Sequence, residues 1–130
     1  MTKPIRHLSE LDSKIYLLVA LAYTGLLSFL SLTSTENFPL VEVTYSDKIG
    51  HVLAYFVFTI LWFIAFFRFN LKRSLLAACA IAVAFGVLME VLQGSLSEIR
   101  TPDLFDIIAN SVGTALAVAV VFLLKKRVKN

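Results

Sequence analysis

The stretch that decides the fold is residues 86–113, GVLMEVLQGSLSEIRTPDLFDIIANSVG, in which a short polar segment separates two strongly apolar runs. Two such runs joined by so short a connection predict a hairpin of two membrane-spanning helices. The polar residues of the stretch that can bind or react are Glu90, Gln93, Arg100, Asp103, Asp106 and Asn110. The sequence therefore places a candidate site at the mouth of this hairpin.

The composition predicts a membrane protein. Of the 130 residues, 58 % are hydrophobic and 16 % are charged, and the mean hydropathy is +0.83. A soluble domain contains roughly 45–50 % apolar residues, so this chain has too little polar surface to coat a water-soluble globule. The formal charge of +3 comes from basic residues at the ends and in one turn, a distribution that indicates membrane lipids rather than nucleic acid as the partner.

Four apolar runs predict an all-α bundle of four transmembrane helices that forms one domain over residues 1–130. A helix needs about 20 apolar residues to cross the hydrocarbon layer. A cleaved signal peptide is the competing interpretation of the first run, but such peptides have an apolar core of roughly 7–15 residues and an A-x-A-like site, which the residues after Leu32 do not offer. The expected spans are 15–32, 49–67, 75–93 and 104–124.

Small residues recur every four positions on the third and fourth runs. Such ladders let two helices approach closely in lipid, so each is expected to face a neighbouring helix. Glu90 continues the first ladder and should also point inward. The ladders are Ala78, Ala82 and Gly86, and Ala109, Gly113 and Ala117.

The distribution of lysine and arginine predicts the orientation. Ten of the 12 basic residues lie in the amino-terminal segment, the second turn and the carboxyl tail, and only Lys48 and Arg100 lie in the other two connections. Cytoplasmic loops carry the excess of basic residues. Both termini are therefore expected in the cytoplasm, with the chain as a multi-pass protein of the cytoplasmic (inner) membrane. The polar residues are expected at the outer face of that membrane.

A second polar group joins the first. Asp47, His51 and Tyr55 are spaced i, i+4, i+8, which places them on one face of the second helix. A charge at the bilayer centre costs roughly 2.5–3.5 kcal/mol, and less near the boundary, where Lys48 and Arg100 also supply opposite charges. The expected contacts are an ion pair between Arg100 and a carboxylate, and hydrogen bonds between His51 and the other carboxylates and Gln93 or Asn110.

These residues suggest two kinds of role. Glu90, His51 and Asp106 are the catalytic candidates, because carboxylates and imidazole carry out acid/base chemistry. The same residue types bind divalent metals, but no local ligand spacing indicates one, so no metal ligand is assigned and any cofactor stays open. The candidate binding residues are Arg100, Asp47, Gln93, Asn110 and Tyr55.

The combined pattern resembles the VanZ-like family of small bacterial membrane proteins. The matching motifs are Asp47-Lys48-x2-His51-x3-Tyr55, then Glu90-x2-Gln93, then Arg100-x5-Asp106-x3-Asn110-x2-Gly113, over about Ile15 to Val121. The family often has a second glycine where this chain has Ala117, which implies a modest change in helix approach. The family is named for a protein associated with low-level resistance to teicoplanin, a glycopeptide that acts on cell-wall precursors outside the membrane.

Two classes of function follow. In the first, an outward-facing polar pocket binds or modifies a lipid-linked envelope molecule and alters glycopeptide susceptibility. In the second, the chain is a non-enzymatic scaffold whose polar residues only hold the helices together. A transporter is a weaker third class, because the charges are confined to one side of the bilayer. The residues alone decide neither the enzymatic activity nor the oligomeric state.

Overall fold

The computed structural model describes residues 3–33, 44–96 and 101–128, with side chains from residue 12 onward in the first range and from residue 47 in the second. These residues form four helices, each long and apolar enough to cross a membrane. Each predicted span lies within one of them, and the predicted all-α class with four helices of membrane-spanning length is confirmed. The helices are α1 (Lys3–Leu32), α2 (Thr44–Arg68), α3 (Ser74–Leu96) and α4 (Leu104–Val128).

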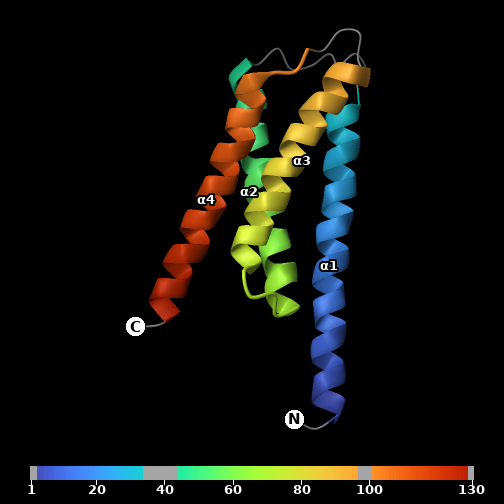
Figure 1. Cartoon of the computed structure of the whole chain (residues 1–130), viewed down its shortest axis with the longest axis vertical. Coiled ribbons are helices and arrows are strands. Elements are labelled where there is room, and N and C mark those ends of the chain that lie inside the picture. Colours follow the sequence, from blue (N-terminus) through green and yellow to red (C-terminus); the bar gives the residue numbers. More distant parts are fainter. Residues whose placement is uncertain (1–2, 34–43, 97–100, 129–130) are drawn as a thin grey trace.

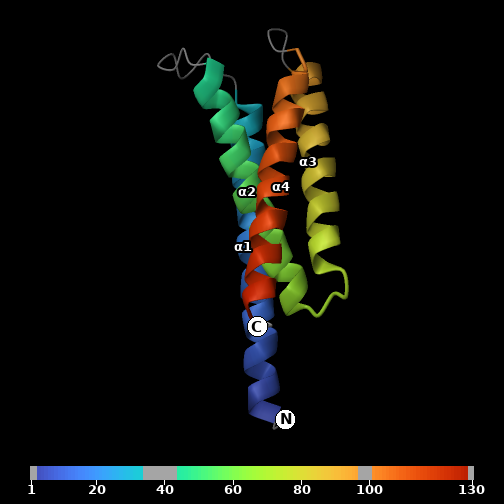
Figure 2. The same ribbon diagram turned by 90° about the vertical axis from the view of Figure 1, so that its left-hand side faces the viewer.

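The helices run alternately up and down, so α1 begins and α4 ends at the same end of the bundle (Figure 1). The amino-terminal turns of α1 project beyond the other helices at that end (Figure 2). Helix α2 is central, because it contacts each of the other three and makes its most extensive contact with α4. The polar residues that begin α2 and α4 therefore share the opposite end of the bundle.

An aromatic cluster joins α1, α2 and α3 in the apolar part of the bundle. The rings of Phe58 and Phe85 stack with centroids 4.9 Å apart. Trp62 is buried, and its indole nitrogen donates a hydrogen bond of 3.1 Å to the Thr24 hydroxyl on α1. The cluster forms because several aromatic residues lie on one face of α2.

Both small-residue ladders are buried between helices, as predicted. At Gly113 a Cβ atom would stand 3.0 Å from the backbone nitrogen of Phe56 and closer still to the carbonyl oxygen of Val52. Helix α4 therefore touches the backbone of α2 at this point, which only glycine permits. This contact fixes the distance between the two helices one turn below Asn110.

The turn between α2 and α3 is closed by Asn70, whose φ is 58°. Asparagine tolerates this left-handed conformation better than most residues. The backbone nitrogen of Asn70 donates a hydrogen bond of 3.0 Å to the Phe67 carbonyl oxygen, and the backbone nitrogen of Leu71 donates one of 3.0 Å to the Phe66 carbonyl oxygen. These two bonds form a Schellman motif, which satisfies the last carbonyls of α2.

Candidate polar site at one end of the bundle

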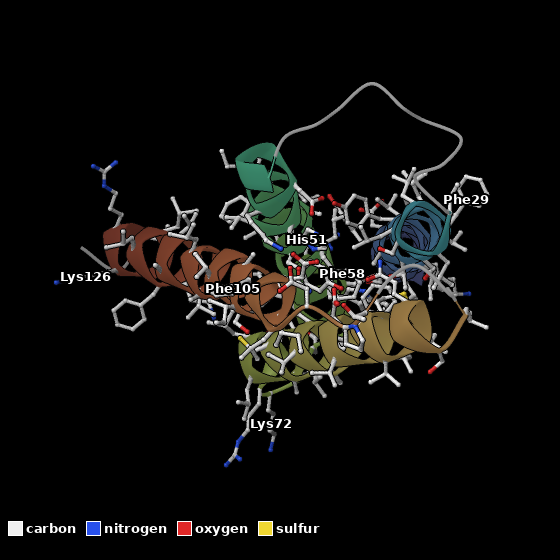
Figure 3. All side chains as sticks on the ribbon, turned by 90° about the horizontal axis from the view of Figure 1, so that it is seen from above. Phe29, His51, Phe58, Lys72, Phe105 and Lys126 are labelled. Atoms are coloured by element: carbon white, nitrogen blue, oxygen red, sulfur yellow. The ribbon has the colours of Figure 1, made fainter. Side chains whose placement is uncertain are left out.

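Polar side chains from α2, α3 and the start of α4 gather at the end of the bundle opposite the chain termini. In the view along the bundle, His51 lies among the helices, whereas Lys72 and Lys126 project outward (Figure 3). Glu90 and Asn110 are buried, whereas the side chain of Asp47 is 56 % exposed. The group thus extends from the buried interior to the surface, and we call it the polar cluster: Asp47, Lys48, His51, Glu90, Asp103, Asp106 and Asn110.

Lys48 forms the ion pairs of the polar cluster. Its ammonium lies 2.6 Å from Asp103 Oδ2 and also contacts Asp106 Oδ1. Both carboxylates belong to the start of α4, so these pairs tie α2 to α4. An acid in the first turn also interacts favourably with the positive end of the helix dipole.

Asp103 begins α4 as its N-cap. Its Oδ1 accepts a hydrogen bond of 2.8 Å from the backbone nitrogen of Phe105, which satisfies one of the free donors of the first turn. The bond from Lys48 and this backbone bond lower the pKa of the Asp103 carboxyl. Glu90 reaches the same corner from α3, where its Oε2 accepts a hydrogen bond of 3.2 Å from the Asp103 backbone nitrogen. Glu90 therefore holds the end of α3 against the start of α4.

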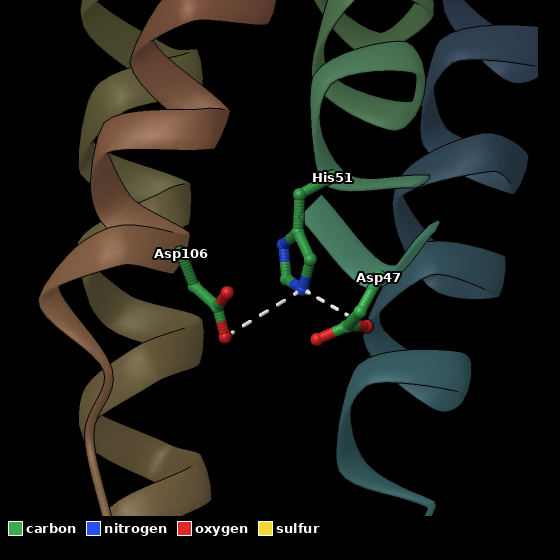
Figure 4. A group of neighbouring side chains, drawn as sticks. All are labelled: Asp47, His51 and Asp106. Atoms are coloured by element: carbon green, nitrogen blue, oxygen red, sulfur yellow. Dashed lines mark ion pairs between the residues drawn. The ribbon is translucent and has the colours of Figure 1, made fainter. Parts of the chain in front are cut away.

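His51 is held by Asn110 and faces two carboxylates. Its Nδ1 lies 2.9 Å from Asn110 Oδ1, and since an amide oxygen only accepts, Nδ1 carries the hydrogen. Its Nε2 points toward Asp106 Oδ2 at 3.7 Å and Asp47 Oδ1 at 3.9 Å (Figure 4). The predicted contact between His51 and Asn110 is thus present, with Asp106 and Asp47 beyond hydrogen-bond distance on the other side.

The same three side chains form a group that could hold a metal ion. One ligand atom from each of Asp47, His51 and Asp106 can be chosen so that all lie within 4.8 Å of one another. The sequence assigned no metal ligand, because two of these residues lie on α2 and the third lies on α4, so that no local spacing joins all three. The arrangement of the helices brings them together.

Two predicted binding residues lie apart from the polar cluster. The Gln93 amide donates a hydrogen bond of 2.6 Å to the carbonyl oxygen of Ser31, so it joins α3 to α1 and does not bond His51 as one expectation had it. Tyr55 is buried, and its ring packs against Phe58 and Phe85. Their binding roles stay predictions.

Arg100 lies outside the described residues, so its predicted ion pair and binding role stay predictions. Asp106 has Lys48 as its cationic partner, an alternative that the sequence allowed. The sequence assigned neither a catalytic nor a binding role to Lys48 or Asp103, although Asp103 belongs to the polar stretch. Two signals could have identified them: Lys48 adjoins Asp47 at the start of an apolar run, and an aspartate before such a run is typical of an N-cap.

Comparison with known proteins identifies the family of the chain. The family model described as VanZ/LLP1 matches residues 5–125. The chain belongs to the VanZ/LLP1 family. One relative is a fission yeast protein, "Uncharacterized protein C11E3.10" of Schizosaccharomyces pombe, which is 33 % identical over 89 residues. That alignment covers 68 % of this chain and 54 % of the yeast protein, so the chain spans about half the length of this relative. No solved structure matches the chain.

Proposed function

We propose that this VanZ/LLP1 family member lies in the cytoplasmic membrane of a bacterial cell with both termini inside and the polar cluster at the outer face. There the polar cluster forms a pocket that binds or modifies a lipid-linked envelope molecule. Through that molecule the protein influences susceptibility to glycopeptides of the teicoplanin type. Family membership and the excess of basic residues at the end that carries the termini support the proposal.

One observation carries the proposal: ionisable side chains from three helices converge at one end of an otherwise apolar bundle. Ionisable groups inside a membrane-spanning bundle are costly and typically mark a functional site. The side chains of Asp47 and Asp103 are open to the surface, while Glu90 and Asp106 lie deeper. A lipid headgroup at the bilayer surface could therefore reach the outer members directly.

The contacts of His51 would suit acid/base chemistry. Asn110 holds the hydrogen on Nδ1, so the neutral ring presents the lone pair of Nε2 toward the open side. A base oriented by a hydrogen bond to its other ring atom is the arrangement that general-base catalysis needs. His51 would take a proton from a headgroup hydroxyl or from water, and Asp106 would stabilise the imidazolium.

The yeast relative favours a ligand that occurs in both bacteria and fungi. Glycopeptide targets belong to bacterial cell walls, whereas lipids with phosphate headgroups occur in both bacteria and fungi. A ligand that family members in both could bind would be recognised through its lipid and phosphate parts rather than through a cell-wall peptide. We therefore place the phosphate-bearing headgroup in the polar cluster.

The second candidate function is the scaffold, and one observation favours it. Several polar side chains bond one helix to another: Gln93 reaches Ser31 on α1, Tyr23 reaches the Ala54 carbonyl on α2, and Thr59 reaches Thr114 on α4. Interhelical hydrogen bonds in membranes contribute about 0.6 kcal/mol each on average. Under this alternative the polar cluster is one more set of such contacts.

Asp47→Asn separates the two candidates, with Asp12→Asn as the matched control. The two aspartates have nearly equal side-chain exposure, 56 % and 55 %, and Asp12 pairs with Arg68 at the opposite end. Exposed ion pairs contribute about 0–1 kcal/mol, so neither change should lower the amount of protein. The measurement is the change in glycopeptide susceptibility that each variant causes in a bacterial host, normalised to the abundance of that variant. The proposal expects Asp47→Asn to abolish the effect of the protein and Asp12→Asn to retain it, whereas the scaffold expects both to retain it.

A further inference from the structure

The side of His51 that faces Asp47 and Asp106 is short of positive charge. Because Nδ1 carries the hydrogen that bonds Asn110, the Nε2 of a neutral ring has a lone pair and no hydrogen. That lone pair faces two carboxylate oxygens at 3.7 and 3.9 Å. Three electron-rich atoms therefore point at one space, and a cation placed there would attract all three.

The distances suit a shared metal ion better than direct hydrogen bonds. A hydrogen bond from nitrogen to oxygen spans about 2.7–3.2 Å, which is shorter than both separations. A metal with bonds of roughly 2.0–2.2 Å holds neighbouring ligand atoms about 3.0–3.6 Å apart. The observed nitrogen-to-oxygen separations exceed that range by about 0.1 and 0.3 Å, and the three ligand atoms lie within 4.8 Å of one another, so the side chains would rotate inward to share one ion.

The charge of the polar cluster favours a cation independently of this geometry. Among the described residues it contains four carboxylates, from Asp47, Asp103, Asp106 and Glu90, and one ammonium, from Lys48. The ammonium contacts Oδ1 of Asp106, so Oδ2 of the same carboxylate remains directed toward the imidazole. A divalent ion would offset much of the excess negative charge.

We infer that Asp47, His51 and Asp106 bind a divalent transition metal of the zinc or manganese class. Imidazole favours transition metals over Mg²⁺ and Ca²⁺, and carboxylates bind both Zn²⁺ and Mn²⁺. Asn110 fixes the orientation of the His51 ring, and Lys48 holds the Asp106 carboxylate. Metal ligands in proteins are usually oriented by such contacts to neighbouring side chains.

The metal would also explain how an acidic cluster accepts an anionic headgroup. With three protein ligands and an exposed Asp47, coordination positions remain open toward the surface. A phosphate oxygen could occupy one of them, with the metal supplying the positive charge that the carboxylates lack. In that state the metal, and not His51, would activate a headgroup hydroxyl or water, because the metal occupies the Nε2 lone pair. This part of the inference rests on the proposed function, whereas metal binding itself does not.

The experiment measures Zn²⁺ and Mn²⁺ binding to the purified full chain in detergent after treatment with a chelator and its removal. Titration calorimetry gives the affinity and the number of ions per chain for the wild type, Asp47→Asn, His51→Gln and the control Asp12→Asn. Removing a ligand should weaken binding at least tenfold, since even supporting residues affect metal affinity by about 10–100-fold. The fluorescence of the buried Trp62 reports whether each variant is folded.

The inference expects one Zn²⁺ or Mn²⁺ per wild-type chain, with affinity reduced at least tenfold by Asp47→Asn and His51→Gln and unchanged by Asp12→Asn. No stoichiometric binding, or binding equal in wild type and a folded Asp47→Asn chain, would overturn it. No lipid-linked molecule is present in this assay. If the wild type binds no metal but Asp47→Asn abolishes the effect of the protein on susceptibility, the metal is rejected and the proposed function stands. If the wild type binds metal but Asp47→Asn leaves that effect unchanged, the metal inference stands and the proposed function is rejected.

Discussion

Gly113→Ala should weaken the contact between α2 and α4 on which the polar cluster depends. The added methyl carbon would stand 3.0 Å from Phe56 N, about 0.4 Å short of ordinary contact, and closer to Val52 O. Both are backbone atoms, so the helices must separate. Overpacking of this kind costs roughly 1–3 kcal/mol, which corresponds to about a 5-fold to 150-fold change in the unfolding equilibrium. Relieving the Phe56 contact alone needs about 0.4 Å of separation, and the Val52 contact needs more. The His51 to Asn110 bond would therefore lengthen from 2.9 Å to at least about 3.3 Å, beyond the usual range.

The assay is unfolding in detergent by added sodium dodecyl sulfate, followed by the fluorescence of Trp62. Gly25→Ala is the control, because a Cβ at Gly25 has nothing within 4 Å, and alanine there should be neutral or stabilise α1 by up to about 1 kcal/mol. The Gly113→Ala midpoint should fall below that of the wild type, and the Gly25→Ala midpoint should not. Equal midpoints for the two variants would refute the close backbone contact.

The remaining predictions use the same unfolding assay. Asn110→Ala should lower the stability by about 1–3 kcal/mol, because it leaves the Nδ1 hydrogen of His51 without its acceptor; an unchanged midpoint would contradict that bond. Gln93→Leu should cost only about 0.6 kcal/mol, the average for one interhelical bond, and a loss of several kcal/mol would contradict this assignment. The hydrogen bond from Lys48 lowers the pKa of the Asp103 carboxyl in the folded protein. The stability that the ionised carboxylate contributes is therefore present above about pH 4 and is lost as the pH falls through the pKa of the folded state. The midpoints of wild type and Asp103→Asn should therefore differ at pH 7 and converge in acid, and a constant difference would contradict it.

The fold could be predicted from the sequence because its signals are local. The apolar runs are as long as a membrane span, and the small-residue ladders at Ala78 and Ala109 show which faces pack. The structure extends the helices past the apolar runs, by four residues at the end of α4, which continues to Val128, and by twelve at the start of α1, which begins at Lys3. Polar residues can continue a helix beyond the hydrocarbon, and hydropathy does not register them.

The contacts between helices could be predicted only in part. The spacing predicted that His51 lies on one face of the second helix with Asp47 and Tyr55 and contacts Gln93 or Asn110, and His51 and Asn110 do bond each other. The spacing could not show that Gln93 turns toward α1, because helix rotation depends on close contacts such as that of Gly113 with α2. The grouping of Asp106 with the α2 residues depends on the same contact, so local spacing gave no indication of a metal site.

The position of the polar cluster relative to the membrane is the claim on which the account depends most. It is tested by cysteine labelling in intact cells, with Cys79→Ala as the background and single cysteines introduced as Asp47→Cys and Asp12→Cys. The two positions have matched exposure at opposite ends of the bundle. A maleimide that cannot cross the cytoplasmic membrane should label the cysteine at position 47 in intact cells and the cysteine at position 12 only after the membrane is permeabilised. Labelling of position 12 in intact cells, with position 47 protected until permeabilisation, would contradict an outward-facing site.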